Sequence, residues 1–531
     1  MRSGWRQVLW LATLAGPIIA GASLDAPDWL SASNDQLAFS SPSDANVRQD
    51  SVVKVQWETR AGLEKAMRQF EEADLDVWFA GRRGKAWEAV VGFKDGLAAD
   101  AATVAMASDE YGPPMRAQQV PVGDRLSTSL PKLHSAAILR NLSSSSLRTL
   151  DDPMHDAYHP YDNIHEILVK LEETYPDWLR VVSVGKSSEG RDIWGVKVSN
   201  MTSSAPPEED DAEEDVEEED EEMEGPEPLI SVFTGKGGRS HTGKRHKHKK
   251  HGKLGFVVAG TQHAREWIAA STILYLVHDL VVPGDTGSTP FTRLLNAVEF
   301  TFVPVVNPDG YVYSWETDRL WRKSRQPVGV DPARGCFGID LNRNWGHKFQ
   351  PGTRPNPCSD SYPGAKEFES VELQALRDYL LDDANHVDAF LDVHSFGQML
   401  LFPYSYSCDA QTPDQENHYE AVLQAAKALR DVHGRQFETG SVCEVSLTSP
   451  GESLDWTYAV AKIRWSFATE LRDIGVFGFL LPPSQIRPSG EEMSAALRSL
   501  TQFILDARRP HAVIMKRLLT LFTEQKEAGK R

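Results

Sequence analysis

Positive charge is in short supply along this chain of 531 residues: 56 lysines and arginines stand against 76 aspartates and glutamates, a formal net charge of −20. This balance excludes the basic footprint through which proteins bind nucleic acids, so we expect no nucleic-acid partner. Much of the acidic excess lies in one run, Glu208 to Glu224, and the rest of the chain is only mildly acidic. Beyond the N-terminus the sequence also lacks any apolar run long enough to cross a bilayer, which excludes a membrane span.

The N-terminus has the pattern of a secretory signal peptide over residues 1–22. Arg2 and Arg6 precede a short apolar run, 8–15, and small residues follow where cleavage is expected. A membrane anchor is disfavoured because the run is short and is interrupted by Gly-Pro. We therefore expect a secreted or luminal protein, located outside the cell or in the vacuole.

Cysteine is scarce as well, with four residues, which fit an oxidising compartment. They lie in two loop regions, Cys336 and Cys358 in the first and Cys408 and Cys443 in the second. Four cysteines allow three pairings, of which pairing within each region is the simplest. Two Asn-x-Ser/Thr sequons in expected loops are candidate glycosylation sites: Asn141 and Asn200.

The pattern of the chain indicates a small domain (51–126) and a large one (153–510). In the small domain we expect an open α+β arrangement, with strands at 52–57, 76–79 and 87–93 and a helix at 63–70. The preceding residues, 23–50, are rich in Ser, Asp and Asn and are expected to be disordered. Between the domains a polar, Ser-rich linker (127–152) carries basic sites that a protease can cut.

The large domain alternates strands with helices, which predicts an α/β fold with a mixed, largely parallel sheet covered by helices on both faces. Besides a stretch that starts at Gly255, strands are expected at 179–184, 193–198, 298–305, 389–394 and 463–468, and a helix at 163–174. A charged insertion, 202–253, holds the acidic run and a Lys/His-rich tract. We expect a solvated, disordered loop there rather than a metal site. Residues 511–531 form a tail.

The stretch from Gly255 to Trp267 reads as a buried strand that ends in a turn carrying His263 and Glu266. An imidazole and a carboxylate three residues apart can bind one metal ion, although many helices carry this spacing by chance. His394 closes the strand at 389–394, where a lone histidine is more often structural. Together the three side chains make a His₂Glu set, the ligand count of an open catalytic zinc site, and their atoms argue against a soft metal.

The other groups that hydrolysis at such a site needs also have candidates. Zinc lowers the pKa of water and polarises a carbonyl oxygen. Glu470 ends an apolar strand, where a carboxylate can move a proton between water and a leaving amine, although a surface glutamate is the alternative. Arg343 beside Asn342 offers a bidentate grip on a carboxylate, and the segment 319–323 offers a further cation for an oxyanion.

These residues lie in six motifs that follow one another in order. They are Thr-Gln-His-Ala-Arg-Glu-Trp (261–267), Val-Asn-Pro-Asp-Gly-Tyr (306–311), Arg-Leu-Trp-Arg-Lys (319–323), Asp-Leu-Asn-Arg-Asn-Trp (340–345), Asp-Val-His-Ser (392–395) and Glu-Leu-Arg-Asp (470–473). From about Ser51 to Ala507, the charged insertion apart, the chain thereby resembles the A/B-type zinc metallocarboxypeptidases in their zymogen form. The resemblance implies the zinc carboxypeptidase fold, with an eight-stranded-type sheet, and a pro-domain (51–126) that inhibits the enzyme until an activating protease cuts the linker.

The resemblance also implies a role for each matching residue. One zinc ion per chain would be held by His263, Glu266 and His394. Glu470 matches the general base, and Arg322 matches the arginine that stabilises the oxyanion. Pairing of the cysteines within each loop region matches one common disulfide of the family and a second found in some members.

The positions that bind substrate match with one departure. Asn342 and Arg343 match the pair that holds the C-terminal carboxylate of a peptide or protein, and Arg265 lies where a secondary substrate-binding arginine sits. The mobile tyrosine that caps the substrate falls at Leu447, which cannot donate a hydroxyl hydrogen bond. Leu454 lies where family members set specificity, and an apolar residue there favours hydrophobic C-terminal side chains.

A second resemblance, over 307–323 and 405–408, is to a fungal branch of the family that is linked to cell-wall assembly and generally considered inactive. That branch also carries an insertion before the zinc motif and lacks the capping tyrosine, but its members typically lose the general base and alter the Asn-Arg pair, both kept here. Two functions are therefore expected. One is a secreted zinc metallocarboxypeptidase that removes hydrophobic C-terminal residues. The other is an inactive zinc-binding protein in fungal cell-wall organisation, with a cell-wall partner.

Overall fold

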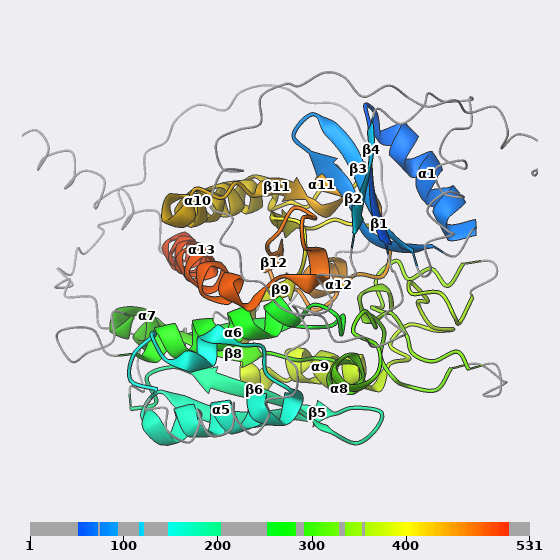
Figure 1. The fold of residues 1–531 in the computed structure, drawn as a ribbon. Helices are drawn as coiled ribbons and strands as arrows, with labels where there is room; N and C mark the ends of the chain where they lie inside the picture. The colour runs from blue at the N-terminus through cyan, green and yellow to red at the C-terminus, as the bar shows by residue number, and fades with distance from the viewer. Residues whose placement is uncertain are drawn as a thin grey trace, which may run out of the picture. The chain divides into compact units, whose positions relative to one another are not determined.

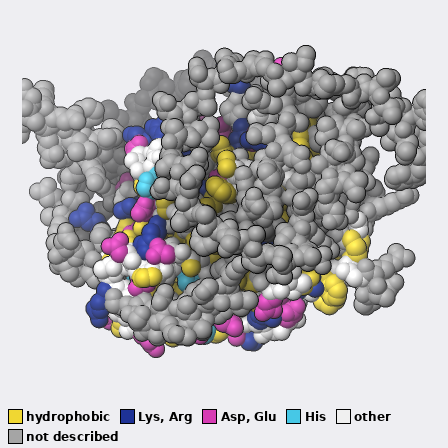
Figure 2. Space-filling view, viewed as in Figure 1, with side chains coloured by type: hydrophobic (Ala, Val, Ile, Leu, Met, Phe, Trp, Pro, Cys, Tyr) yellow, Lys and Arg dark blue, Asp and Glu magenta, His cyan; other side chains and the backbone are white. Residues whose placement is uncertain are grey.

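The computed structural model describes eight parts of the chain: residues 51–72, 75–93, 116–121, 147–202, 252–282, 291–328, 335–352 and 356–508. The expected signal peptide, disordered N-terminal segment, C-terminal tail, Asn141 sequon and Lys/His-rich tract lie outside the described residues, as do most of the linker and of the charged insertion. Among the described residues, no helix is both long and apolar enough to cross a membrane. On the face shown in Figure 2, described acidic and basic side chains are interspersed.

An eight-stranded sheet runs through the large domain, in the order β11-β10-β12-β9-β7-β8-β6-β5. Its strands are β5 (Leu179–Lys186), β6 (Asp192–Val198), β7 (Leu254–Gly260), β8 (Val298–Val303), β9 (Val387–His394), β10 (Met399–Phe402), β11 (Glu438–Ser441) and β12 (Trp465–Glu470). The pairs β7–β8, β7–β9, β9–β12 and β10–β11 are parallel, and the remaining neighbours are antiparallel. The predicted mixed, largely parallel sheet is confirmed.

Helices cover both faces of this sheet (Figure 1). They are α5 (Tyr161–Thr174), α6 (Trp267–Val281), α7 (Thr292–Ala297), α8 (Pro308–Glu316), α9 (Val371–Leu381), α10 (Gln415–His433), α11 (Val442–Val445), α12 (Ser453–Ala459) and α13 (Ile486–Ala507), with 3-10 turns at Pro153–Asp156, Leu341–Arg343, Asp383–Asn385, Gly478–Leu480 and Pro483–Gln485. Phe256 and Val258 of β7 pack in one cluster with α5, α6, α10 and α13, whereas Val257 and Ala259 pack in the other with α9 and α12. The two-residue period of the strand therefore sorts the helices into two layers.

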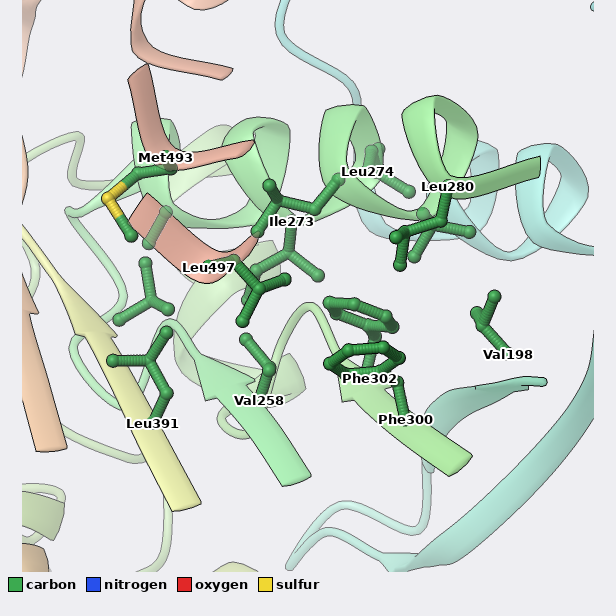
Figure 3. Packing of buried hydrophobic residues seen from close by; sticks show 14 of the residues in the cluster. Val198, Val258, Ile273, Leu274, Leu280, Phe300, Phe302, Leu391, Met493 and Leu497 are labelled. Atoms are coloured by element: carbon green, nitrogen blue, oxygen red, sulfur yellow. The ribbon is translucent and has the colours of Figure 1, made fainter. Parts of the chain in front are cut away.

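The larger cluster fixes the middle of the sheet. Figure 3 shows Val258, Phe302 and Leu391, from three adjacent strands, on the side of the sheet that faces Ile273 of α6 and Leu497 of α13. All five side chains are buried, and each large apolar side chain that is fully buried contributes about 1.5–3 kcal/mol. This packing holds the ends of β7, β8 and β9 in fixed positions.

The N-terminal domain, residues 51–72, 75–93 and 116–121, is a four-stranded antiparallel sheet with one helix. Its elements are β1 (Ser51–Trp57), α1 (Arg60–Glu72), β2 (Asp76–Arg83), β3 (Ala86–Phe93) and β4 (Arg116–Pro121), with the strand order β2-β3-β1-β4. Leu63, Ala66 and Phe70 form one face of α1 and pack in a cluster with Val53 and Val55 of β1. Strand β4 was not predicted, because its sequence Arg-Ala-Gln-Gln-Val-Pro has no apolar alternation.

The large domain differs from its prediction by one or two residues at several strand boundaries, and by two additional strands. The strand expected at 463–468 is β12, which begins only at Trp465, and the strand expected at 298–305 ends at Val303. Pro304 follows directly and has no N–H to donate to a ladder. Strands β10 and β11, with four residues each, were not predicted. Both disulfides of the simplest pairing are present: Cys336–Cys358 and Cys408–Cys443.

Candidate active site

The carboxyl ends of three neighbouring strands bring the predicted site residues to one edge of the sheet. Strand β9 lies between β7 and β12 and runs parallel to both, with His394 opposite Glu470 at the last position. His263 and Glu266 follow β7 directly, just before α6. Because parallel strands end at the same edge, four residues from three distant segments of the sequence meet where α/β proteins characteristically bind ligands.

His263, Glu266 and His394 form a buried cluster whose candidate ligand atoms all lie within 4.8 Å of one another. The Glu266 carboxylate lies between the two imidazoles: its Oε1 is 2.7 Å from Nδ1 of His263, and its Oε2 is 3.1 Å from Nδ1 of His394. Two nitrogens and a carboxylate at this spacing are the donor set that a catalytic zinc ion takes from a protein.

A buried aspartate holds each imidazole from behind. Nε2 of His263 is 3.0 Å from Oδ1 of Asp340, and Nε2 of His394 is 3.0 Å from Oδ2 of Asp392. An ionised carboxylate only accepts hydrogen bonds, so each Nε2 donates to its aspartate, and each Nδ1 is directed at the cluster, where it can bind a metal ion. Such carboxylate–histidine pairs orient the ligands of zinc sites, so the residues present fit a zinc ion.

Arg322 is fixed beside this cluster by the same aspartate. Its Nε and Nη2 donate to Oδ2 of Asp340 at 3.1 and 3.0 Å, while the other carboxylate oxygen contacts His263. Burial alone would raise the pKa of Asp340, but the Arg322 guanidinium and His263 hold it well below its usual range. Asp340 therefore stays ionised and sets the positions of one predicted metal ligand and of the predicted oxyanion arginine.

Glu470 ends β12 beside the same cluster. Burial raises its pKa to about 8; His394 and Arg322 oppose this rise, and Glu266 adds to it. Gly397 leaves room for the side chain, because a Cβ at that position would lie 3.0 Å from the Cβ of Glu470. A carboxyl group with a pKa near neutrality can both accept a proton and return it.

Asn342 and Arg343 lie on the 3-10 turn Leu341–Arg343, against the loop that precedes α12. Oδ1 of Asn342 accepts a hydrogen bond from the backbone N of Ser453 at 2.9 Å. Nη1 of Arg343 donates to the carbonyl oxygen of Asn342 at 2.6 Å and to Oε1 of Glu452 at 3.1 Å. The arginine predicted to bind a terminal carboxylate thus contacts a carboxylate of the chain itself.

Arg265 is bound to the N-terminal domain. Its Nη1 donates to both carboxylate oxygens of Asp76, at 2.9 and 3.1 Å, and its guanidinium carbon lies 4.3 Å from the centre of the Phe479 ring. Burial would raise the pKa of Asp76, but Arg265 brings it below its usual value. The predicted secondary substrate-binding arginine is therefore engaged by a carboxylate of the small domain.

A cavity of about 860 Å³ joins these groups. Its lining includes the metal cluster, Glu470 and Arg343, together with Leu454, Val442 and Ala468, which make part of the wall apolar. The cavity therefore brings Arg343, Glu470 and an apolar wall together around the candidate metal centre.

The N-terminal domain also lines this cavity, through residues of α1 and β2 that include Trp78 and Phe79. Leu447, at the position predicted for the capping tyrosine, lines the same cavity and packs against the hydrophobic cluster of the N-terminal domain. The leucine thus contributes apolar surface to a contact between the two domains.

A family model described as zinc carboxypeptidase matches residues 164–496, well over half of the chain. The chain belongs to the zinc carboxypeptidase family. The match covers all three candidate ligands and Glu470, and it leaves out the N-terminal domain.

Relatives within the family carry different names. An "Inactive metallocarboxypeptidase ecm14" from Talaromyces stipitatus is 34% identical over 67% of this chain and 56% of its own length. The chain thus matches little more than half of that relative. A "Metallocarboxypeptidase A-like protein" from Trichophyton verrucosum is also 34% identical, over 67% of this chain and 74% of its own length. Carboxypeptidase A from Helicoverpa armigera has the same fold, with a TM-score of 0.63, 22% identity and coverage of 86% of this chain and 98% of that one.

Sequence reasoning did not assign four carboxylates that shape this zinc carboxypeptidase site: Asp76, Asp340, Asp392 and Glu452. Asp392 could have been found, because it lies two residues before His394 on one strand, and such residues share a face. Asp76 and Glu452 are paired with arginines of distant segments, and nothing in the sequence signals such pairs.

Proposed function

We propose that this chain is a secreted zinc metallocarboxypeptidase that hydrolyses the C-terminal peptide bond of peptides or proteins, with a preference for hydrophobic C-terminal residues. The observation that carries the proposal is the convergence at one sheet edge of a buried His₂Glu cluster, an arginine that binds carboxylates and a glutamate with a raised pKa. All of them line a single cavity.

Each group has a defined task in such a reaction. A zinc ion held by His263, Glu266 and His394 supplies a Lewis acid that acidifies water and polarises the scissile carbonyl. Glu470 takes the proton of the attacking water and returns it to the leaving amine. Arg322, fixed by Asp340, stabilises the charge that develops on the carbonyl oxygen.

Arg343 and Asn342 confine the reaction to the end of a chain. A guanidinium that holds the terminal carboxylate positions the last peptide bond over the metal centre and excludes internal bonds. The apolar wall with Leu454, Val442 and Ala468 supports a preference for aliphatic or aromatic terminal side chains. Removal of such a side chain from water favours binding by about 25 cal/mol per Å² of apolar surface.

The N-terminal domain acts in this proposal as an inhibitory pro-domain (51–126). Asp76 forms an ion pair with Arg265, and Trp78 packs on Phe479 with ring centres 5.3 Å apart. Arg83 donates a hydrogen bond to the carbonyl oxygen of Gly397. These contacts cover the site, so a protease that cuts the linker (127–152) is the expected activator.

Secretion, outside the cell or into the vacuole, is supported by the two disulfides, which persist in oxidising compartments. At the second sequon, Nδ2 of Asn200 donates to Oδ1 of Asn296 at 2.7 Å, and Oδ1 accepts from the hydroxyl of Thr202 at 2.7 Å. Attachment of a glycan to Asn200 therefore requires the bond to Asn296 to open.

A second candidate function is a catalytically inactive, zinc-binding protein of fungal cell-wall organisation that keeps a cell-wall partner. Two observations favour it. Leu447 replaces a capping tyrosine and packs against the N-terminal domain, which stabilises the covered state. Several relatives at 32–34% identity are named inactive.

The test is release of C-terminal amino acids from peptides that end in Phe, Leu, Lys or Glu. The full chain, loaded with zinc and cut within the linker, is compared with Glu470→Gln, which keeps the shape of the side chain but cannot accept a proton. Release of Phe or Leu that Glu470→Gln reduces by about 100-fold or more supports the enzyme. No release by the correctly cut, zinc-loaded chain supports the inactive function instead.

A further inference from the structure

The carboxylate of Glu452 forms an ion pair with Arg343, the residue to which the proposed function assigns the C-terminal carboxylate of the substrate. Oε1 of Glu452 lies 3.1 Å from Nη1 of Arg343, and their side chains are 11% and 28% exposed. Both residues line the cavity over the metal centre. A glutamate carboxylate and a peptide's C-terminal carboxylate are the same chemical group, and both seek the planar donors of an arginine.

The chain holds Glu452 in this position from both sides. The residue before it, Gly451, accepts a hydrogen bond from the backbone N of Trp345 at 3.0 Å, and the residue after it, Ser453, donates to Oδ1 of Asn342 at 2.9 Å. Gly451 has φ +80°, and a Cβ there would lie 2.4 Å from the carbonyl oxygen of Arg343. Only a glycine allows the loop to approach the arginine this closely.

Glu452 is positioned to cap a helix, but its carboxylate does not do so. It is the residue that precedes helix α12 (Ser453–Ala459), yet its side chain makes no hydrogen bond to the end of that helix. The carboxylate instead turns to Arg343. Burial raises the pKa of Glu452 above its usual value, and Arg343 and the Ser449 hydroxyl oppose that rise.

We propose that Glu452 is a built-in competitor for the C-terminal carboxylate of substrates, and hence a determinant of which peptide ends this site accepts. The inference rests on the proposed role of Arg343. A substrate carboxylate that binds Arg343 displaces the Glu452 carboxylate, and the two negative charges then lie close together. Because this part of the cavity wall is partly buried, solvent screens their repulsion only weakly. Peptides that end in Asp or Glu bring a third negative charge and are disfavoured most.

The test measures binding of two peptides by calorimetry, one that ends in Phe with a free carboxylate and the same peptide as its C-terminal amide. In this measurement every protein, the unaltered chain included, also carries Glu470→Gln so that the peptide is not hydrolysed. The protein is the full chain, loaded with zinc and cut within the linker. Glu452→Gln keeps the size of the side chain and removes its charge. Glu420→Gln, the same change on the exposed surface of α10, is the matched control.

We expect Glu452→Gln to tighten binding of the free-acid peptide by about tenfold, which corresponds to about 1.4 kcal/mol, and to leave the amide unchanged. Glu452→Ala gives the same change in the acid-to-amide ratio, which separates lost charge from altered packing. In turnover, measured with Glu470 intact, KM for the free acid falls while kcat stays constant. Glu420→Gln changes neither ratio.

The outcomes separate this inference from the proposed function. If the free acid binds Glu452→Gln no more tightly than the unaltered chain, or if neither peptide binds any variant, the inference is overturned. If the acid-to-amide ratio shifts as expected but no protein with Glu470 intact hydrolyses peptide, Glu452 is a competitor at the arginine and the chain is not an enzyme.

Discussion

Acid should destabilise this protein at a defined place, the buried histidine pair that anchors the start of the large domain. Nε2 of His155, in the 3-10 turn Pro153–Asp156, lies 2.9 Å from Nδ1 of His278 in α6, and Nε2 of His278 lies 2.9 Å from the carbonyl oxygen of Leu147. A carbonyl only accepts, so Nε2 of His278 carries a hydrogen, its Nδ1 accepts, and His155 donates. Both rings are neutral in this arrangement.

The magnitude follows from the pKa of His155. Burial, together with His278, Arg487 and His159, lowers that pKa from 6.5 to about 2. Above pH 6.5 neither the folded nor the unfolded chain binds a proton at His155, so this residue does not lower the free energy of unfolding. Below it the unfolded chain binds a proton that the folded chain excludes, so the free energy of unfolding falls by about 1.4 kcal/mol per pH unit and by about 2 kcal/mol at pH 5.

The assay is urea unfolding of the full chain at about pH 7.5 and about pH 5, with His155→Phe as the variant. The variant loses stability at the higher pH, because Nδ1 of His278 is left without its donor. The difference between the two pH values should nevertheless shrink by about 2 kcal/mol relative to the unaltered chain. His433→Phe, at a half-exposed histidine at the end of α10, should leave that difference within about 0.5 kcal/mol. An unchanged pH difference in His155→Phe would refute the reasoning.

Two further predictions concern the carboxylates around the site. Asp340→Asn removes the charge behind His263 and the partner of Arg322, so zinc affinity measured by competition with a chelator should fall by about 10- to 100-fold; unchanged affinity would show that Asp340 does not support the ligand. Asp76→Asn removes the nearer carboxylate of the buried Arg265 and leaves only Asp360, at 3.8 Å, at a cost of up to about 3–5 kcal/mol, so after a cut in the linker the N-terminal domain should separate from the large domain on gel filtration. Continued co-elution at the same concentration as the unaltered chain would contradict that role.

The parts of the fold that were predicted from the sequence are those with a strong local signal. Strand β7 could be recognised because it is buried on both faces, and its seven residues form a nearly continuous apolar run. Strand β11, Glu-Thr-Gly-Ser, has no apolar signal at all and joins the sheet by its parallel pairing with β10. Four residues are too few for a period to be read.

The residues of the site also divide into those with a local sequence signal and those without one. His263 and Glu266 stand in one turn and could be paired by spacing, whereas the contact between Arg343 and Glu452 joins segments 109 residues apart. Whether a charged side chain meets a partner across such a distance depends on the approach of two backbones, here permitted by the positive φ of Gly451. A single sequence does not show how closely two distant segments of backbone lie to each other.

If Arg265 binds substrate as the proposed function expects, its ion pair with Asp76 makes the small domain and the substrate compete for one guanidinium. If only one of them can bind at a time, thermodynamic linkage makes the effect reciprocal: every factor by which the domain weakens peptide binding is a factor by which peptide weakens the hold of the domain. Peptide at about 100 times its dissociation constant would loosen the domain by about 2.7 kcal/mol. A high concentration of substrate would then displace the N-terminal domain from the site by mass action, before any protease has cut the linker.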